Sequence, residues 1–369
     1  MKFNNLEKFL KRIEIKNFLS LQDTIIEFSH FTVLIGPNAS GKSNILKVLN
    51  FLSYLPKSTS IKNAINKLFK NNKFTDIFYN DSKLITIILN VHLLDREYKY
   101  TLSFNDKGKV KKEILYSNDT ILINFSGTNG YYIINNKGQK VQINKELNSP
   151  VISRKDIQNS FIKTFKSFFN DIKFFHFIPN QIRNYSSSGY NKNLESDGSN
   201  LAQVLHTLLT TERELFFKIE DILKNIILVI DRLDTPPSIE GNKVYLTIQE
   251  KNIKNLLSFS NISDGTLRLL AFITAMKLSG SIICFEEPEN CVHPYLFETL
   301  IDIMKNSNKQ VIITTHSPYL QDKIELDNVR VVKKVDNKTC VSKIKNIDYI
   351  KKMLGEGFTL GELLYMENF

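Results

Sequence analysis

The first fifty residues carry two kinds of hydrophobic pattern. Residues 12–18 and 24–28 alternate polar and apolar side chains, which predicts two half-buried strands. Residues 31–35 form an uninterrupted apolar run that is typical of a buried strand, and apolar side chains recur at helical spacing over 44–54. The pattern therefore predicts three strands, a glycine-containing loop and an amphipathic helix.

Residues 84 to about 143 combine alternating, β-branched and aromatic positions with turn-forming segments. The expected strands are 84–94, 97–104, 109–116, 120–125 and 131–135, separated by turns at 105–108, 126–130 and 136–138. This spacing indicates an antiparallel meander inserted after the first helix. Residues 155–170 and 199–234 are expected to be helical, and 186–189 to be a flexible connection.

Beyond residue 260, helical and strand patterns alternate. The expected order is a helix over 266–278, a buried strand over 281–285, a helix over 294–305, a buried strand over 310–315, a short helix and a strand over 329–333. Strands that alternate with helices form parallel sheets. The chain is therefore predicted to be an α/β protein.

The loop between the third strand and the first helix matches G-x-x-x-x-G-K-[ST] in full, and in this setting the match predicts a phosphate-binding loop. Its backbone N–H groups and the helix dipole would hold phosphates. Lys42 would contact the β- and γ-phosphates, and Ser43 would be a magnesium ligand. The predicted ATP-binding residues are Gly36, Pro37, Asn38, Ala39, Ser40, Gly41, Lys42, Ser43 and Asn44.

Polar side chains follow the two later buried strands. Glu286 and Glu287 come at the end of one strand, and His316 follows the other. Because parallel strands end at one edge of a sheet, we expect all three beside the phosphate loop. Glu286 would hold magnesium, Glu287 would polarise the attacking water, and His316 would sense the γ-phosphate. A solvated acidic loop and a polar strand cap are the ordinary alternatives.

Length and composition indicate a globular protein. The chain has 369 residues, 42% of them hydrophobic, which is enough for a large core. Three cysteines without metal-ligand spacing and the lack of a signal-like or membrane-spanning segment favour a cytoplasmic protein without a membrane partner.

The net charge of +11 is consistent with a DNA partner or with lysine-rich coding alone. Two lysine clusters are the candidate DNA contacts, namely Lys62, Lys67, Lys70 and Lys73, and Lys107, Lys109, Lys111 and Lys112.

Three motifs carry a family resemblance. They are Asn261-Ile262-Ser263-Asp264-Gly265-Thr266, Glu286-Glu287-Pro288-Glu289-Asn290-Cys291-Val292-His293-Pro294 and Thr314-Thr315-His316-Ser317-Pro318. They resemble the signature, the Walker B and D-loop, and the H-loop of RecF/SMC/OLD-type ABC ATPases. Taken alone, 263–266 is also a normal helix N-cap and turn.

The resemblance implies a P-loop ABC-type ATPase head, with a mixed or parallel core sheet, the inserted β-meander and a helical subdomain. ATP and Mg²⁺ are the implied cofactors. Ser263, Asp264 and Gly265 would contact the nucleotide held by the other subunit of a homodimer or higher oligomer, and Gln181 would be the Q-loop ligand of the metal. The implied divisions of this single head are 1–54, 55–175 (the inserted lobe), 176–260 (the Q-loop and helical subdomain), 261–335 (the signature to the H-loop) and 336–369.

The motifs differ from those of transporter ATPases, whose signature reads L-S-G-G-Q. The roughly fifty residues after His316 contain no clustered carboxylates suited to a two-metal nuclease. The resemblance therefore implies an ATP-switched dimer that acts on or in response to DNA, as the ATPase component of an anti-phage defence system with a separate effector such as a nuclease. The alternatives are a nucleotide-gated scaffold that clamps a protein partner and a recombination-repair ATPase.

Overall fold

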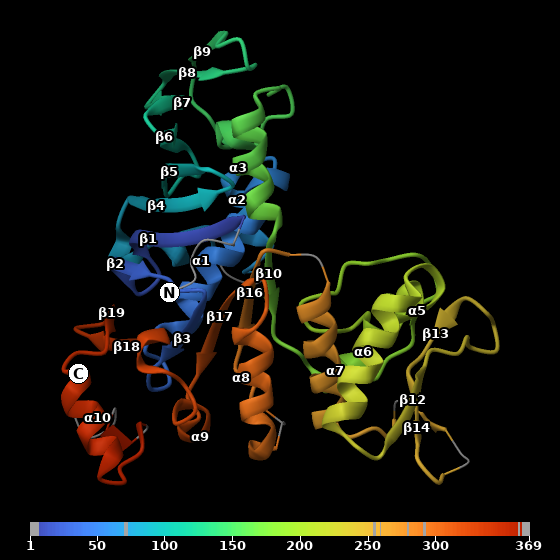
Figure 1. The fold of residues 1–369 in the computed structure, drawn as a ribbon. Helices are drawn as coiled ribbons and strands as arrows, with labels where there is room; N and C mark the ends of the chain where they lie inside the picture. Colours follow the sequence, from blue (N-terminus) through green and yellow to red (C-terminus); the bar gives the residue numbers. More distant parts are fainter. Residues whose placement is uncertain are drawn as a thin grey trace.

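Two large sheets organise the molecule. A computed structural model describes residues 7–69, 73–253, 256–258, 260–278, 280–290, 293–360 and 362–363. An eight-stranded antiparallel sheet forms the upper part, and a six-stranded sheet lies below it, with a helical lobe beside the second sheet (Figure 1).

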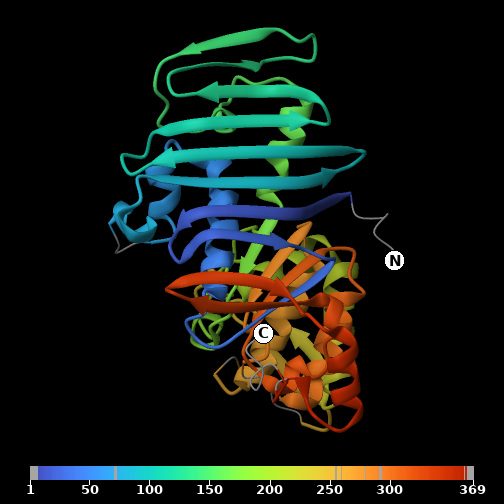
Figure 2. The same cartoon turned by 90° about the vertical axis from the view of Figure 1, so that its left-hand side faces the viewer.

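The upper sheet has the strand order β2-β1-β4-β5-β6-β7-β8-β9. Its strands are β1 (Lys8–Phe18), β2 (Leu21–Glu27), β4 (Leu84–Leu93), β5 (Arg96–Asn105), β6 (Val110–Ser117), β7 (Thr120–Ser126), β8 (Asn129–Ile133) and β9 (Lys140–Asn144). One face packs against helices α1 (Lys42–Tyr54) and α3 (Ser160–Asn170), and the other is open in Figure 2. The meander is thus confirmed, and it is continuous with the first two strands of the chain.

The lower sheet has the order β10-β16-β17-β3-β18-β19 and is parallel except for its last pair. Its strands are β10 (Ile172–Phe175), β16 (Ile282–Glu286), β17 (Gln310–Thr315), β3 (Phe31–Ile35), β18 (Val329–Val335) and β19 (Lys338–Lys343). In this register Glu286 lies beside Thr314, which lies beside Leu34. The carboxyl ends of β16, β17 and β3 therefore meet at one edge, as the sequence predicts.

The lower sheet separates two hydrophobic cores. Alternate residues of each buried strand face opposite sides, so that Cys284 and Ile312 join the core shared with the upper sheet. Their neighbours Phe285 and Ile313 join the core under the helical lobe. This two-sided burial explains why these strands read as continuous apolar runs.

The helical lobe contains a small sheet that the pattern did not predict. Helices α5 (Leu201–Thr211) and α6 (Arg213–Ile226) confirm most of the predicted helical stretch, but its end is β12 (Ile230–Asp234). This strand pairs with β14 (Thr247–Glu250), which pairs with β15 (Leu257–Ser258). The prediction of a flexible connection at 186–189 is wrong in part, because β11 (Ser186–Ser187) pairs with β13 (Lys243–Val244). Strands this short pair with distant segments and leave no clear alternation in the local sequence, which is why the pattern did not predict them.

The remaining helices range from 4 to 14 residues in length. They are α2 (Ile61–Asn66), α4 (Pro179–Ile182), α7 (Asp264–Lys277), α8 (Phe297–Lys305), α9 (Pro318–Gln321) and α10 (Ile347–Gly355). Within the described residues, no helix is both long and apolar enough to cross a bilayer.

A buried carboxyl group ties the upper sheet to the segment that follows it. Glu113 of β6 is fully buried and accepts hydrogen bonds from Tyr100 Oη (3.0 Å), the Ile152 backbone N–H (3.0 Å) and the Val151 backbone N–H. Burial raises its pKa to about 7, although these hydrogen bonds oppose the increase. The folded state therefore holds this proton more tightly than the unfolded chain does.

Glu113 should make stability depend on pH near neutrality. The contribution of the protonated Glu113 to the free energy of unfolding is complete at low pH and is lost as the pH rises through about 7. We expect the free energy of unfolding to fall by about 1 kcal/mol more between pH 6 and pH 8 in the wild type than in Glu113→Gln. Urea titrations at the two pH values measure this difference. Glu240→Gln, at an exposed turn, is the control and should keep the wild-type pH dependence.

Candidate functional site

The predicted phosphate loop connects β3 to α1. Ala39 and Gly41 have positive φ angles of 62° and 108°, and α1 begins at Lys42. A Cβ atom on Gly36 would lie 2.0 Å from the Val332 carbonyl oxygen of β18. The loop therefore needs glycine where it leaves the sheet, because the backbone of the adjacent strand fills the space that a side chain would take.

Lys42 lies across this loop. Its side chain is largely buried, and Nζ donates to the carbonyl oxygens of Gly36 (2.6 Å) and Pro37 (2.9 Å). Burial lowers the pKa of Lys42, whereas Glu287 and the other nearby carboxylates oppose the decrease. The ammonium group is thus held within the curve of the loop, where it can contact a bound phosphate.

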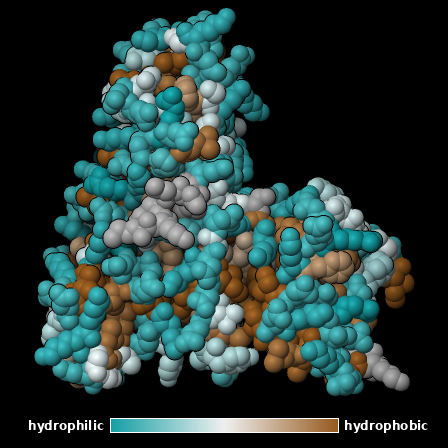
Figure 3. Space-filling model, in the orientation of Figure 1, coloured by the Kyte–Doolittle hydropathy of each residue, from teal (hydrophilic) through white to brown (hydrophobic). Residues whose placement is uncertain are grey.

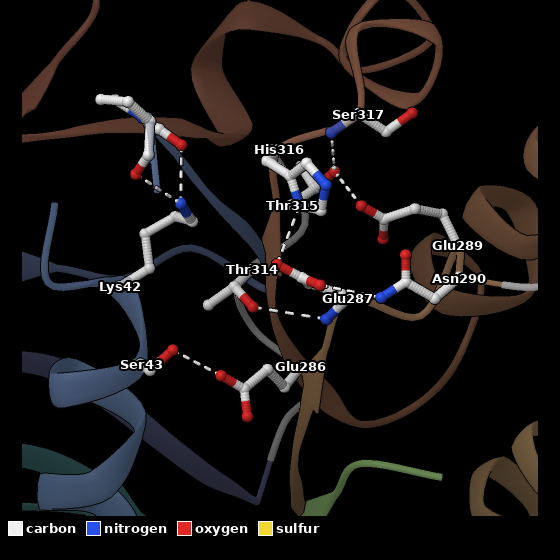
Figure 4. Close-up of polar contacts among 12 residues, drawn as sticks. Lys42, Ser43, Glu286, Glu287, Glu289, Asn290, Thr314, Thr315, His316 and Ser317 are labelled. Carbon is white, nitrogen blue, oxygen red and sulfur yellow. Dashed lines mark hydrogen bonds and ion pairs between the residues drawn. The ribbon is translucent and has the colours of Figure 1, made fainter. Parts of the chain in front are cut away.

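Ser43 and Glu286 meet across the sheet edge. The Ser43 hydroxyl donates to Glu286 Oε1 (Figure 4). On the other carboxylate oxygen, His176 Nδ1 lies 3.8 Å from Glu286 Oε2. Mg²⁺ binds through few protein oxygens and keeps several waters or phosphate oxygens. A hydroxyl and a carboxylate oxygen in contact beside a phosphate loop fit this preference, so Ser43 and Glu286 are the residues that would hold the ion.

Glu287 is held by hydrogen bonds to both carboxylate oxygens. Oε1 lies 2.8 Å from His316 Nδ1, and Oε2 accepts from Asn290 Nδ2 at 2.8 Å (Figure 4). The backbone has a φ of 48°, and its N–H donates to Thr314 O. Partial burial raises the pKa of Glu287, but the bond from Asn290 and the proximity of His316 outweigh burial, so this pKa lies below its ordinary value. The group is therefore an ionised, oriented carboxylate, as a water-positioning residue must be.

A third carboxyl group connects the two strand ends. Glu289 is 5% exposed and accepts from the Thr315 hydroxyl, which in turn accepts from the Ser317 backbone N–H at 3.0 Å. Burial raises the pKa of Glu289. In the described part of the chain, its second oxygen has no hydrogen-bond partner. Glu289 thus joins the segment after β16 to the segment that carries His316.

The predicted signature residues lie at the start of α7. The Ser263 hydroxyl caps this helix by accepting from the Thr266 N–H at 3.1 Å. Arg183 donates to Asp264 Oδ1 at 2.6 Å and to the Ile262 carbonyl, and Arg268 donates to the Asn290 carbonyl at 3.1 Å. In residues 7–69 and the other described ranges, no hydrogen bond joins the signature to the phosphate loop of the same chain. Cys291 and Val292 of the predicted D-loop lie outside the described residues.

Within the described ranges, no hydrogen bond joins the Gln181 side chain to Ser43 or Glu286. Gln181 is exposed in α4, and the contact from this segment to Glu286 is made by His176 instead. The assignment of Gln181 as a metal ligand stays a prediction. His176 was missed, although it is the first residue after β10, a strand that runs parallel to β16.

Known proteins with similar sequences indicate the family of this chain. Residues 31–322 match the model of a family described as "AAA domain, putative AbiEii toxin, Type IV TA system". The chain belongs to this family. A relative from Helicobacter pylori named "ATP/GTP phosphatase" is 24% identical over 350 residues, covering 84% of this chain and 85% of the relative.

Solved structures of Smc heads share the fold. The Smc head bound to the C-winged helix domain of ScpA superposes with a TM-score of 0.61 at 14% identity, covering 93% of this chain and 99% of the other. The Smc head with an extended coiled coil, bound to the C-terminal domain of ScpA derived from Pyrococcus furiosus, gives 0.57 at 12% identity, covering 95% and 99%. The family match and the named relative identify the protein as an ATPase, and the solved structures give it the fold of an SMC/RecF-like, ABC-type head.

Removing the loop ammonium tests the phosphate site. We expect Lys42→Ala to weaken binding of a fluorescent ATP analogue by roughly 100-fold, because one charge-assisted contact is lost, and to abolish turnover. Lys47→Ala removes the same charge from the same helix, where Nζ lies 5.5 Å from the centre of the Phe69 ring, and should leave both properties unchanged. Wild-type affinity in Lys42→Ala would show that this loop is not the phosphate site.

Proposed function

We propose that the protein is a nucleotide-switched dimer in which each subunit completes the other's MgATP site. The proposal rests mainly on the separation of two sets of residues. The phosphate loop, Glu286, Glu287 and His316 converge at one sheet edge. Ser263 and Gly265 lie instead at the start of α7, where Arg183 donates to their neighbours Asp264 and Ile262. A helix N-terminus is a ready anion site. A second copy could present this end of α7 to the γ-phosphate.

The chain's own residues have distinct parts in hydrolysis. The loop N–H groups and Lys42 hold the phosphates, and Glu287 orients a water toward the γ-phosphate. His316 is hydrogen-bonded to Glu287, so it can report the occupancy of the γ-phosphate site to that carboxylate. Held by Ser43 and Glu286, Mg²⁺ would neutralise charge on the β- and γ-oxygens. Closure of the second subunit would exclude water from the reacting groups.

Relatives suggest the setting in which this switch works. The family description names a putative AbiEii toxin of a type IV toxin–antitoxin system, and the Smc heads were solved with ScpA domains bound. We propose that this ATPase likewise works with a separate protein, an effector such as a nuclease, in defence against phage. The name of the H. pylori relative adds GTP as a second nucleotide to test.

A basic surface supports an action on DNA. A Cβ atom on Gly108 would lie 2.8 Å from Lys62 Cγ, so Lys62 of the first predicted cluster lies beside the turn that carries Lys107 and Lys109 of the second. The upper half of the molecule is largely hydrophilic on the face shown in Figure 3, whereas apolar side chains gather in the lower half. Lys70 lies outside the described residues. DNA phosphates would be bound here without reading of the base sequence.

One observation favours the second candidate, a nucleotide-gated scaffold for a protein partner. Lys109 and Lys111 lie 3.3 and 3.6 Å from the same Glu146 carboxylate, which reduces the net charge of the surface. A polyanion would have to compete with this ion pair. Turnover stimulated by DNA favours the first candidate, and tight binding of a protein partner without such stimulation favours the scaffold.

Glu287→Gln tests the switch. The amide keeps the size and part of the hydrogen bonding of the side chain but loses the charge, so MgATP should bind while turnover falls about 100- to 1000-fold. The protein should then accumulate as an ATP-dependent dimer, measured by sedimentation with nucleotide occupancy in the same samples. Glu298→Gln, on α8, is the control and should turn over normally. An oligomeric state that does not respond to bound MgATP would contradict ATP-driven closure.

Salt dependence tests the basic surface. For Lys107→Ala combined with Lys112→Ala, we expect the slope of log affinity for duplex DNA against log salt to become shallower by about 1.8, because two phosphate contacts are lost. Fluorescence anisotropy at several KCl concentrations gives the slope. Lys351→Ala combined with Lys352→Ala, exposed on α10, should keep the wild-type slope. A slope that is identical in all three proteins would exclude Lys107 and Lys112 from the DNA contact.

A further inference from the structure

A threonine near the end of the chain contacts the phosphate loop from behind. Thr339 is the second residue of β19, is 2% exposed and donates from Oγ1 to the Ser40 carbonyl oxygen at 2.9 Å. Its own backbone is fixed by the β1–β2 hairpin, since Thr339 N–H donates to Ser20 O (2.8 Å) and Thr24 Oγ1 donates to Thr339 O (2.9 Å). The hydroxyl is therefore presented to the loop by a rigid support.

The direction of the surrounding hydrogen bonds follows from their chemistry. A carbonyl oxygen only accepts, so the single Thr339 hydroxyl proton points to Ser40 O. The Ser20 hydroxyl, 2.6 Å away, must then donate to Thr339 Oγ1. With its proton committed, Ser20 Oγ accepts from Asn44 Nδ2 at 2.8 Å. A one-way series of three hydrogen bonds thus runs from Asn44, at one end of the phosphate loop, to Ser40 within it.

This series determines which way a loop N–H group points. In a planar trans peptide, the C=O and the following N–H lie on opposite sides, and the described residues contain no cis peptide. Anchoring Ser40 O on Thr339 therefore turns the Gly41 N–H away from β19 and toward the phosphate side of the loop. A Cβ atom on Gly41 would lie 2.0 Å from Thr339 Oγ1, so the glycine also makes room for the hydroxyl that orients it.

We infer that Thr339 is a positioning residue for nucleotide binding, which sets the Gly41 N–H through the Ser40 carbonyl. The inference rests on the proposed assignment of residues 36–43 as the phosphate site. A buried carbonyl that loses its hydroxyl partner can rotate, and restoring its orientation when ATP binds then reduces the net binding energy. Thr339 never needs to touch the nucleotide for this effect, which should appear in affinity more than in the chemical step.

The test compares Thr339→Val, which replaces the hydroxyl with a methyl group of similar size, with Thr339→Ser, which keeps it. We expect Thr339→Val to raise the Kd for a fluorescent ATP analogue and the KM for ATP by about ten-fold, with kcat changed by less than about two-fold. Thr339→Ser should stay within about two-fold of the wild type in all three. Cys340→Ser, the next residue along β19, is the matched control and should be unchanged.

Three outcomes would overturn the inference. The first is wild-type Kd and KM in Thr339→Val. The second is an equal loss in Thr339→Ser, which would show that the packing of the side chain and not its hydroxyl causes the effect. The third is a loss confined to kcat. If Thr339→Val does not fold, Ser20→Ala decides, because it removes the middle donor and should raise the Kd about three-fold. Lys42→Ala distinguishes a failure of the proposed phosphate site from a failure of this inference. If Lys42→Ala does not bind ATP while Thr339→Val is fully active, the phosphate site stands and only the role of Thr339 is rejected.

Discussion

The parallel pairing of β3, β17 and β16 is the constraint on which the site depends. Backbone hydrogen bonds place Leu34, Thr314 and Glu286 in one row, so the phosphate loop, the His316 segment and the carboxylates all begin at the same edge. Each strand is buried on both faces, and a register shift would turn its apolar side chains to the wrong cores. The packing that stabilises the fold therefore also fixes the relative positions of the reactive groups.

Three carboxyl groups within four positions acquire different properties from their surroundings. Glu286 contacts the Ser43 hydroxyl, Glu287 is kept ionised by Asn290 and His316, and burial shifts Glu289 toward its neutral form. Such divergence suits a site that needs a metal ligand, a water-orienting group and a structural bridge at once. The bridge from Glu289 to Thr315 also means that the D-loop and H-loop segments cannot move independently without loss of a buried hydrogen bond.

The phosphate loop is held between elements from both ends of the chain. The β1–β2 hairpin and β19 meet behind it, and their contacts converge on Ser20 and Thr339. In the helical lobe, Arg183 donates to Asp264 of the predicted signature, and Arg268 donates to the Asn290 carbonyl of the predicted D-loop. A change at the nucleotide therefore has direct contacts through which to reach the lobe and, in the proposed dimer, the second subunit.

The sequence alone determined the elements with strong local signals. The phosphate loop, the buried strands that lead to Glu286 and His316, and the meander follow from spacing and periodicity, because each depends on residues close in the chain. Several features were not predicted. They are the small sheet in the helical lobe, the hydrogen bonds of Asn290 to Glu287 and of Thr315 to Glu289, the contact of His176 with Glu286, and the contact of Thr339 with the phosphate loop. Glu289, Asn290 and Thr315 lay within the quoted motifs, yet their partners could not be assigned. Only the tertiary structure decided these features, because hydrogen bonds between residues as far apart as Ser40 and Thr339 depend on how the sheets meet, and no local pattern encodes that.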